Sequence, residues 1–371
     1  MMSARFLTVV LERAFNMRDG FGREIDYMRI SVIDSCNLNC YYCNPCDNNE
    51  HCHALNILSV KEVLCIVRAA TRLGIKHFRL TGGEPLLHPQ LDEMVLQIKK
   101  IPGVSSVSLT TNAVLLAQHA KWLKEAGIDS INVSLDTIDA SEYERITKKP
   151  LLEEVKHGIN AAIECGIRVK INVVLTPQTD VVALTRYVAK KGTDIRFIEM
   201  MPVGEGHTNG VEPYKKVIGT LSKLYGEPCR INTEKTKEIN SANDKRKIPD
   251  NGPAEYYIFP ELGIRVGLIQ AIHGKFCDTC NRIRVTADGR LMPCLGSSVT
   301  MDLVPDSWDF ADDVEKDFAI VRALRAAIKA KPRCHNFNDN AVTYTKTTET
   351  KTTEIEAAEV NAARNMSRIG G

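Results

Sequence analysis

Two groups of three cysteines constrain this chain more than any other feature. The first group lies in the stretch Cys36-Asn-Leu-Asn-Cys40-Tyr-Tyr-Cys43, and the second comprises Cys277, Cys280 and Cys294. Closed structural zinc sites usually take four Cys or His ligands, whereas thiolates at similarly short spacings hold four-iron clusters. Three thiolates can bind three irons of such a cluster and leave the fourth iron open to a small molecule. The spacing therefore predicts two reactive metal centres.

Zinc sites and disulfides are the alternatives to iron–sulfur clusters. His51 and His53 follow the first triplet and could complete a zinc site there. The chain has twelve cysteines, but we identify no secretory signal peptide. Closely spaced cysteines in an intracellular chain more often bind metal or take part in catalysis than form a disulfide framework. We therefore favour clusters at both triplets.

The composition is that of a globular protein, with 44% hydrophobic and 25% charged residues. Lys and Arg total 48 against 46 Asp and Glu, so the overall charge gives no reason to expect a nucleic-acid partner. No apolar run approaches the ~20 residues that span a bilayer, so we expect no membrane-embedded role. Residues 1–20 form an N-terminal extension that only faintly resembles a transit peptide, and we expect a cytoplasmic protein.

Between residues 28 and 201, short β-branched runs alternate with amphipathic helical patterns, which indicates βα units around a parallel sheet. The six expected strands are Met28–Ile33, Lys76–Leu80, Ser105–Leu109, Ser130–Leu135, Arg168–Leu175 and Asp194–Ile198. The first expected helix opens with a capping box, Ser59 and Glu62. Later helices are expected over Leu91–Lys100, Leu115–Ala126, Leu152–Cys165 and Val181–Lys191. Six units are too few for a closed eight-stranded barrel, so the fold class is α/β, with a partial (β/α)6 barrel.

Polar motifs follow the first three of these strands directly. The first cysteine loop follows strand one, Gly82-Gly83-Glu84-Pro85 follows strand two, and Thr110-Thr111-Asn112 follows strand three. In parallel α/β sheets, ligands bind beyond the carboxyl ends of the strands. We therefore expect these motifs to meet at one mouth.

The pattern changes after the sixth strand. We place the barrel core at residues 21–205 and a C-terminal α+β region, which carries the second triplet, at residues 206–340. In that region a helix is expected around Pro213 to Leu224, with strands at Glu255 to Phe259 and Ile264 to Ile269. Residues 341–371 combine a Thr-, Lys- and Glu-rich linker with a terminal Gly370-Gly371.

The first triplet, with an aromatic residue before its last cysteine, and the Gly-Gly-Glu-Pro motif resemble the radical S-adenosylmethionine (SAM) superfamily. The resemblance implies that SAM chelates the open iron of a [4Fe–4S] cluster. One electron, which an external donor must supply, then cleaves SAM to methionine and a 5′-deoxyadenosyl radical.

A narrower resemblance, to the GTP 3′,8-cyclases of molybdenum cofactor biosynthesis, covers nearly the whole chain. It is carried by Gly22-Arg23, by the stretches 79–87, 133–137 and 196–204, by Phe276 to Arg284 through Cys294, and by Gly370-Gly371. It implies conversion of GTP to (8S)-3′,8-cyclo-7,8-dihydro-GTP, in which the radical removes the hydrogen at ribose C3′. It also implies a second [4Fe–4S] cluster that meets the guanine, a downstream enzyme that forms cyclic pyranopterin monophosphate, and a possible homodimer.

The resemblance assigns site residues position by position. Tyr42, Gly83, Ser134 and Met201 are expected to contact SAM, while Gly82 lets the backbone approach it and Glu84 can accept a hydrogen bond nearby. The expected GTP contacts are Arg23, Arg79, Thr110, Lys170, Arg282, Ile283 and Arg284, to which the strand-end residue Arg196 is added. Fixed arginines suit a triphosphate because their planar fork matches phosphate oxygens. Catalytic roles are expected for Arg282, Arg284, Gly370 and Gly371, with the two glycines inserted toward the active site.

The chain departs from the family pattern at three places. Ala113 stands where Gly is common after Thr-Thr-Asn, and His77 stands where another Lys is expected. The latter could make phosphate binding weaker or sensitive to pH, because histidine titrates near neutrality. Cys46 follows the first triplet, and we expect it to be a spectator rather than a fourth ligand.

Two other functions remain open on the sequence. One is a radical SAM enzyme with an auxiliary cluster that acts on a peptide or another small molecule. The other is a non-enzymatic iron–sulfur protein that transfers electrons and cleaves no SAM. The arginines beside the second triplet favour catalysis on GTP over both.

Overall fold

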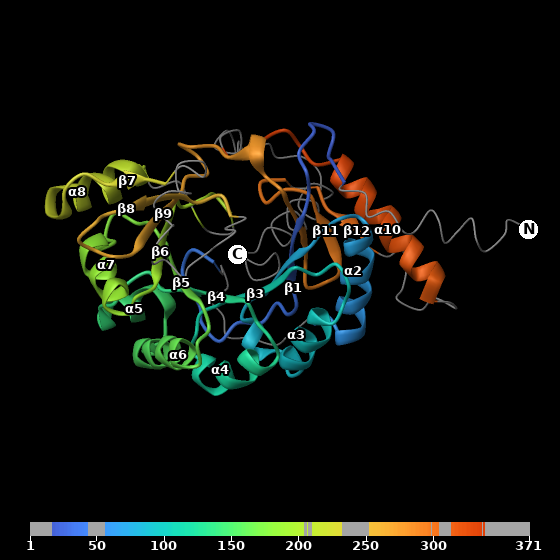
Figure 1. Cartoon of the computed structure of the whole chain (residues 1–371), viewed down its shortest axis with the longest axis horizontal. Coiled ribbons are helices and arrows are strands. Elements are labelled where there is room, and N and C mark those ends of the chain that lie inside the picture. The colour runs from blue at the N-terminus through green and yellow to red at the C-terminus, as the bar shows by residue number, and fades with distance from the viewer. Residues whose placement is uncertain are drawn as a thin grey trace, which may run out of the picture.

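A single twelve-stranded sheet organises the chain (Figure 1). The computed structural model describes residues 17–43, 56–203, 206, 210–231, 252–297, 299–303, 313–335 and 337. The strand order is β12-β11-β10-β1-β2-β3-β4-β5-β6-β9-β8-β7, and within the described residues no pairing joins β12 to β7. The sheet is therefore curved and open, which confirms the expected partial barrel.

The six predicted strands are all present as neighbours in this sheet. They are β1 Tyr27–Ser31, β2 His77–Thr81, β3 Ser106–Thr111, β4 Ser130–Ser134, β5 Val169–Val174 and β6 Asp194–Ile198. Each pairs in parallel with the next. Because the strands are parallel, the loops that follow them gather at one edge of the sheet.

Helices cover the outer, convex face of the sheet (Figure 1). They are α2 Val60–Arg72, α3 Leu91–Lys99, α4 Leu116–Glu125, α5 Ala140–Thr147, α6 Leu152–Glu164 and α7 Val181–Lys190. The capping box of α2 forms as predicted, since the Ser59 hydroxyl accepts from the Glu62 amide and the Glu62 carboxylate accepts from the Ser59 amide at 2.7 Å. The short helix α5 was not predicted.

Strands from the C-terminal half extend the sheet at both ends. Beside β6 lie β9 Arg265–Ile269, which is parallel to it, then β8 Glu255–Ile258 and β7 Cys229–Arg230. Beside β1 lie β10 Arg282–Val285, also parallel, then β11 Arg290–Met292 and β12 Met301–Asp302. The three strands next to β1 were not predicted. The sheet is thus continuous across residue 205, and the domain boundary proposed there stays a prediction.

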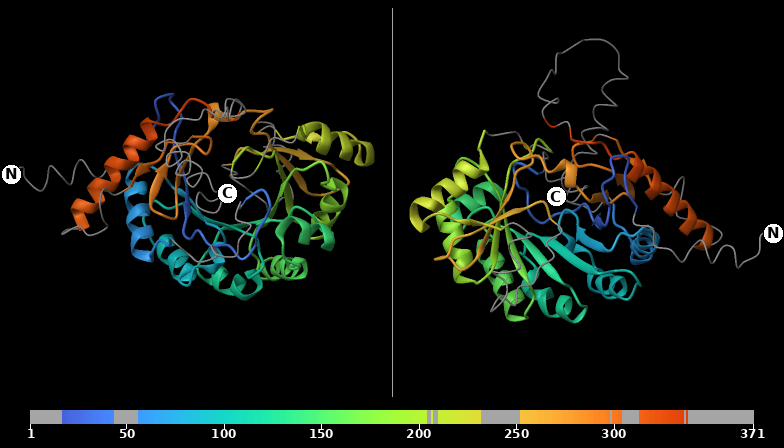
Figure 2. Two further views of the ribbon diagram at one scale, coloured as in Figure 1. Left: turned by 180° about the vertical axis from the view of Figure 1, so that it is seen from behind. Right: turned by 45° about the horizontal axis from the view of Figure 1, so that its top comes forward.

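Further helices lie at the two ends of the molecule (Figure 2). At one end, the π-helical turn η3 Tyr214–Ile218 continues into α8 Gly219–Tyr225, in the region where a helix was expected. At the other end, the unpredicted helix α10 Asp313–Lys329 packs against α2, and Arg72 pairs with Asp317 at 2.8 Å. Short turns of 3-10 helix are η2 Pro85–Leu87 and η4 Cys277–Thr279.

The two faces of the sheet differ in polarity. Side chains that face the helices are apolar and fully buried, as at Met28, Phe78 and Leu109. Their neighbours along each strand point inward, because side chains alternate along a strand. These inward side chains are polar and include Arg29, Arg79, Ser108, Asn132 and Lys170. The interior of the partial barrel is therefore a polar cavity rather than a packed apolar core.

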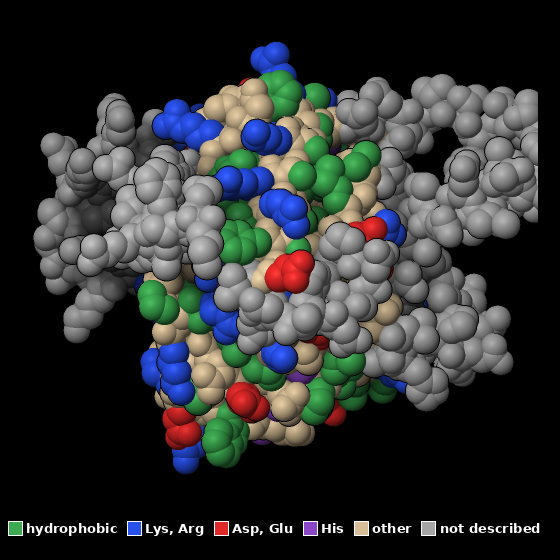
Figure 3. All heavy atoms as spheres, turned by 90° about the vertical axis from the view of Figure 1, so that its right-hand side faces the viewer, with side chains coloured by type: hydrophobic (Ala, Val, Ile, Leu, Met, Phe, Trp, Pro, Cys, Tyr) green, Lys and Arg blue, Asp and Glu red, His purple; other side chains and the backbone are tan. Residues whose placement is uncertain are grey.

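On the outer surface near α10, Lys and Arg side chains are scattered among hydrophobic and acidic ones (Figure 3). In the described part of the chain no helix is both long enough and apolar enough to span a bilayer. Residues 1–16 of the predicted extension, the linker 341–371 and Gly370-Gly371 lie outside the described residues.

The left-handed backbone conformation of Ala113 leads to a testable prediction. Ala113 is fully buried and has φ +66°, a left-handed conformation that costs an L-residue roughly 1–2 kcal/mol. Glycine avoids this cost, so Ala113→Gly should lose less unfolding free energy than the same change at Ala120, which is buried within α4. We expect a difference of about 1–2 kcal/mol in chemical unfolding. Equal losses at the two positions would show that Ala113 is unstrained.

Candidate active site

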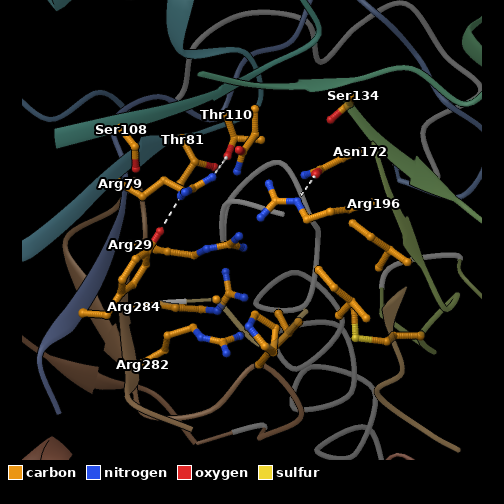
Figure 4. Close-up of a pocket in the computed structure, with 18 of the residues that line it drawn as sticks. Arg29, Arg79, Thr81, Ser108, Thr110, Ser134, Asn172, Arg196, Arg282 and Arg284 are labelled. Atoms are coloured by element: carbon orange, nitrogen blue, oxygen red, sulfur yellow. Dashed lines mark hydrogen bonds between the residues drawn. The ribbon is translucent and has the colours of Figure 1, made fainter. Parts of the chain in front are cut away.

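Both cysteine triplets line one cavity inside the partial barrel. Its volume is about 600 Å³, and its walls come from the strands β1 to β6, from β10, and from the loops beyond them. Cys36, Cys40 and Cys43 lie on its wall, and so do Cys277, Cys280 and Cys294. Figure 4 shows arginines from β1, β2, β6 and β10 pointing into the space between. Metal centres at the two triplets would therefore face a common chamber.

The first cysteine loop is held by side chains from the ends of β3 and β4. The Tyr42 hydroxyl donates to Asp136 at 2.5 Å, and Asp136 in turn accepts from the Val174 amide at 2.8 Å. The Asn112 amide nitrogen donates to Asn37 at 2.7 Å and lies 3.8 Å from the Cys36 sulfur. These contacts fix the loop against the strand ends, as the convergence of motifs at one mouth predicted.

The Gly82-Gly83-Glu84 segment packs on the same loop. The Gly83 amide donates to Ile33 O, and the Glu84 amide donates to Ser35 O, both at 2.8 Å. A Cβ at Gly83 would collide with the backbone oxygens of Ser35 and Asp34. Only glycine therefore allows this approach.

Glu84 is fully buried and does not line the cavity. Its carboxylate accepts hydrogen bonds from the Thr111 hydroxyl and the Asn112 amide, each at 2.7 Å, and from the Leu86 amide at 3.0 Å. Burial raises the pKa of Glu84 to about 7, although these hydrogen bonds oppose the rise. Glu84 thus joins the loops after β2 and β3 instead of reaching into the chamber.

The two triplets differ in electrostatic surroundings. Burial raises the pKa of Cys36 to about 12 and that of Cys43 to about 11. At Cys280, burial also opposes ionisation, but the charges of Arg282 and Lys331 outweigh it and lower the thiol pKa. Burial raises the pKa of Cys277 as well, so the nearby cations assist loss of the thiol proton at Cys280 but not at Cys277.

The fit of iron to these cysteines rests on donor chemistry. Thiolates are the usual ligands of four-iron clusters, and each binds a different iron, so they need not converge on one point. Among the described residues, no three His, Cys, Asp or Glu side chains converge as on a single metal ion. The three thiols of each triplet match the donors that a four-iron cluster takes. His51, His53 and Cys46 lie outside the described residues.

A row of arginines crosses three neighbouring strands. In the sheet register Arg29 of β1 lies beside Arg284 of β10 on one side and beside Arg79 of β2 on the other. Arg282 enters the same space from the start of β10 (Figure 4). Burial, and next the charge of Arg284, hold the pKa of Arg29 well below its usual range. Like charges at this spacing repel, so the row is suited to a polyanion.

Hydrogen bonds orient the basic side chains of the cavity. Arg79 donates from Nε to the Tyr27 hydroxyl and from a terminal nitrogen to the Thr110 hydroxyl at 3.4 Å. Across the cavity, Arg196 donates from Nε to Asn172 at 3.0 Å (Figure 4). Lys170 is 5% exposed and also lines the cavity.

Most predicted site residues meet in this cavity. Its wall includes the predicted SAM and GTP residues Tyr42, Gly82, Gly83, Ser134, Met201, Arg79, Thr110, Lys170, Arg196, Arg282 and Arg284. Ile283 is buried on the opposite face of β10 and does not line it. Gly370 and Gly371 lie outside the described residues.

Arg23 lies outside the cavity wall, in contrast to its predicted place. Its guanidinium pairs with Asp19 at 2.5 Å and donates to Cys277 O, Pro332 O and Arg333 O at 2.6–2.9 Å. These contacts use four of the five N–H donors of the side chain and hold the second cysteine loop from behind. The assignment of Arg23 to GTP stays a prediction.

Sequence reasoning missed Arg29, Tyr27, Asp136 and Lys331, all of which line the cavity. A signal was available for Arg29, because it alternates with the apolar residues Met28 and Ile30 along a strand and so must face inward. Lys331 offered no comparable signal, since it comes from a segment far away in the sequence.

Comparisons with known proteins agree with this architecture. The family model of the radical SAM superfamily matches residues 30–183, and the model described as Molybdenum Cofactor Synthesis C matches residues 193–337. Among solved structures, native anSMEcpe with bound AdoMet superposes with a TM-score of 0.50 at 18% identity, covering 82% of this chain and 84% of that one. Streptococcus suis SuiB bound to the precursor peptide SuiA gives a TM-score of 0.52 at 15% identity, covering 87% and 69%. The chain is a member of the radical SAM superfamily.

Curated relatives show to which family within this superfamily the chain belongs. A protein of Clostridium perfringens (strain SM101 / Type A) is 35% identical, over 86% of this chain and 95% of its own length. Relatives from Pelotomaculum thermopropionicum and Peptoclostridium acidaminophilum are 36% and 37% identical, over 86% of this chain and 95% and 94% of theirs. All three are named GTP 3′,8-cyclase. Within the radical SAM superfamily, the chain belongs to the GTP 3′,8-cyclase family.

Gly83 provides a test of the loop packing. We expect Gly83→Ala to lower the unfolding free energy of the iron-free protein by about 1–3 kcal/mol, because the new Cβ must push the cysteine loop aside. The matched control is Gly219→Ala, where the Cβ meets nothing within 4 Å and the helical φ is −61°. Equal stabilities of the two variants in chemical unfolding would contradict the packing described here.

Proposed function

We propose that this protein is a GTP 3′,8-cyclase that converts GTP to (8S)-3′,8-cyclo-7,8-dihydro-GTP, the first step of molybdenum cofactor biosynthesis. The observation that carries the proposal is the single cavity that has one cysteine triplet on each side and a row of arginines between them. One triplet suits the SAM-cleaving cluster, and the arginines suit a triphosphate. Family membership supplies the reaction.

The first cluster and SAM belong to the superfamily. Cys36, Cys40 and Cys43 would hold three irons and leave the fourth for SAM. When bound and reduced, the cluster and SAM supply a carbon radical that removes a hydrogen atom from the substrate. The chain's own residues bind, orient and enclose the reactants.

We assign the SAM side of the cavity to residues near the first loop. Gly82, Gly83 and Ser134 line the wall there, as does Tyr42, which Asp136 holds in place. Met201, the remaining residue assigned to SAM, also lines the cavity and packs beside Ala271 and Met292. Because Glu84 is buried behind this wall, we assign it to positioning the loops that follow β2 and β3.

We assign the triphosphate to the arginine row. Arg29, Arg79 and Arg284 lie in register, and Arg282 lies beside them. Lys170 and Arg196 approach from β5 and β6, with Thr110 between them and the row. Basic side chains outnumber carboxylates on the cavity wall, where the carboxylates are Asp129 and Asp136. Fixed guanidinium groups bind phosphate oxygens strongly, and the phosphate charges offset their mutual repulsion.

We propose a second [4Fe–4S] cluster at Cys277, Cys280 and Cys294, whose open iron faces the guanine. Under this proposal, residues 21–205 bind SAM, and residues 206–340 carry the second cluster. The terminal Gly370 and Gly371 are proposed to reach the active site.

Several partners complete the proposal. The reaction needs an external one-electron donor, because SAM cleavage consumes an electron. A downstream enzyme must take the product to cyclic pyranopterin monophosphate. We also propose that the protein acts in the cytoplasm, where thiols stay reduced, and that it can form a homodimer.

The main rival within the superfamily acts on a peptide. Its fold is shared, since SuiB bound to its precursor peptide superposes on this chain. A peptide substrate does not call for several arginines in register on a buried wall, and this row favours the triphosphate.

The activity test is anaerobic. The reconstituted protein is reduced with dithionite and given SAM with and without GTP, and 5′-deoxyadenosine and a cyclised GTP isomer are measured by chromatography and mass spectrometry. We expect GTP to stimulate deoxyadenosine formation and the isomer to appear. SAM cleavage without the isomer would keep the superfamily and exclude GTP cyclisation, and no cleavage with both sites loaded would favour electron transfer.

Arg282→Ala tests the triphosphate assignment. Loss of charge-assisted hydrogen bonds of about 1.5–3 kcal/mol should reduce GTP binding by roughly tenfold to a hundredfold. The absorbance of the first cluster should persist. Arg186→Ala is the control, because Arg186 lies on α7, where it donates to Tyr225. An unchanged GTP affinity of Arg282→Ala would show that Arg282 does not contribute to GTP binding.

His77 predicts a pH dependence of GTP binding. Its ring lies against Tyr27, its Nδ1 contacts the Ser106 hydroxyl at 2.8 Å, and it lines the cavity beside Arg79. Burial lowers the pKa of His77 below 6.5, with Lys76 acting in the same direction and Asp26 and Asp129 against it. Phosphate favours the imidazolium, so GTP binding takes up a proton, and affinity falls as pH rises through the pKa of the complex.

The measurement is the KM for GTP between about pH 6 and 8. We expect KM to rise with pH in the wild type, and this rise should be absent in His77→Lys, which stays charged, and in His77→Gln, which stays neutral. Since all three proteins share the ionisation of GTP itself, parallel profiles would show that His77 does not contact phosphate.

A further inference from the structure

Lys331 is a buried cation at the edge of the second cysteine site. The residue follows α10, its side chain is 4% exposed, and it lines the cavity. Its ammonium group donates to Arg282 O at 2.8 Å and to Pro293 O at 2.9 Å. Its charge also acts on Cys280, whose thiol pKa it helps to lower. An ammonium group has three donors, and these two carbonyl groups accept from two of them.

These contacts join the segments that build the second site. Arg282 begins β10, two residues after Cys280, and Pro293 directly precedes Cys294. One ammonium group therefore joins the strand that carries Arg282 and Arg284 to the residue that precedes Cys294. A shift of Lys331 would move cysteines and arginines together.

The surroundings of this ammonium group are predominantly positive. Arg29, Arg282 and Arg284 line the same cavity, and within the described residues no carboxylate forms an ion pair with Lys331. A buried charge is costly unless an opposite charge lies close to it. The two carbonyl groups that accept from Lys331 are neutral, whereas the sulfur of Cys280, on which its charge acts, can carry a full negative charge.

Arg23 provides an internal comparison. It holds the same cysteine loop from behind, through Cys277 O at 2.7 Å and Pro332 O at 2.6 Å. Its charge, however, is paired with Asp19 at 2.5 Å. Arg23 can therefore serve as a neutralised anchor, whereas the charge of Lys331 remains directed at the cysteine set.

We propose that Lys331 is the cationic partner of the second cysteine site, a positioning residue that compensates the negative thiolate-bound group and fixes Arg282 relative to it. The inference deepens the proposed function, because it rests on a metal group at this site. It predicts that assembly of the second site and ordering of the arginine strand depend on one side chain.

The test isolates the second site in the full chain. In a background with Cys36→Ala, Cys40→Ala and Cys43→Ala, Lys331→Met and Lys331→Gln are compared with Lys329→Met, which alters an exposed lysine of α10. Reconstituted iron and sulfide per chain are measured, together with the reduction potential of the remaining cluster by titration followed by electron paramagnetic resonance. Circular dichroism checks that each variant is folded.

We expect Lys331→Met to lose at least half of the second-site iron, because two carbonyl groups lose their donor and the thiolates lose the charge of the nearby cation. Lys331→Gln can still donate hydrogen bonds and should keep more iron, but its potential should be lower than that of the control, since the cation that favours the reduced, more negative cluster is gone. If Lys331→Met does not fold, the potential of Lys331→Gln alone decides. Iron content and potential equal to those of Lys329→Met would overturn the inference.

The outcome is separable from the proposed reaction, because neither readout requires GTP or SAM. If the isolated site binds zinc instead of iron and Lys331→Met releases zinc faster to a chelator, the second cluster is wrong and the role of Lys331 stands. If the iron content and the reduction potential change as expected but the unaltered protein does not cyclise GTP, the proposed substrate is wrong and the role of Lys331 again stands.

Discussion

The parallel pairing of β10, β1 and β2 is the constraint on which the rest of the site depends. This pairing sets Arg284, Arg29 and Arg79 side by side on the inner wall of an open barrel. Three guanidinium groups at neighbouring positions repel one another, and burial deepens that cost. The apolar side chains on the opposite face of the same strands are fully buried against helices and hold the register. Burial of these apolar side chains thus offsets the repulsion between the three guanidinium groups, and a bound polyanion would reduce that repulsion.

The same cavity divides into two electrostatic halves. Near the first triplet stand the buried carboxyl groups of Glu84 and Asp136, whose pKa values burial raises to about 7 and about 6. Near the second triplet stand Arg282, Arg284 and Lys331. This arrangement is the reason why we propose that the triphosphate lies toward β10 and away from the first loop.

Much of the architecture was predictable because it is local. The six core strands, the capped first helix and the convergence of the motifs at one mouth follow from alternation, capping and strand polarity. The pairing of β10 with β1 was not predictable, because it joins residues that lie far apart in the sequence. Sequence reasoning missed Arg29, although the alternation of this residue with Met28 and Ile30 indicated that its side chain faces inward. Arg23 was placed in the GTP site, yet its contacts with Asp19 and the carbonyl of Cys277 appear only when distant segments meet.

The measurement that tests this account most directly follows one hydrogen atom. GTP labelled with deuterium at ribose C3′ is incubated with the reduced protein and SAM, and the 5′-deoxyadenosine is analysed by mass spectrometry. If the cavity holds the triphosphate on the arginine row with its ribose facing the SAM side, deuterium appears in 5′-deoxyadenosine together with the cyclised product. Unlabelled 5′-deoxyadenosine formed while the label stays in GTP would contradict it.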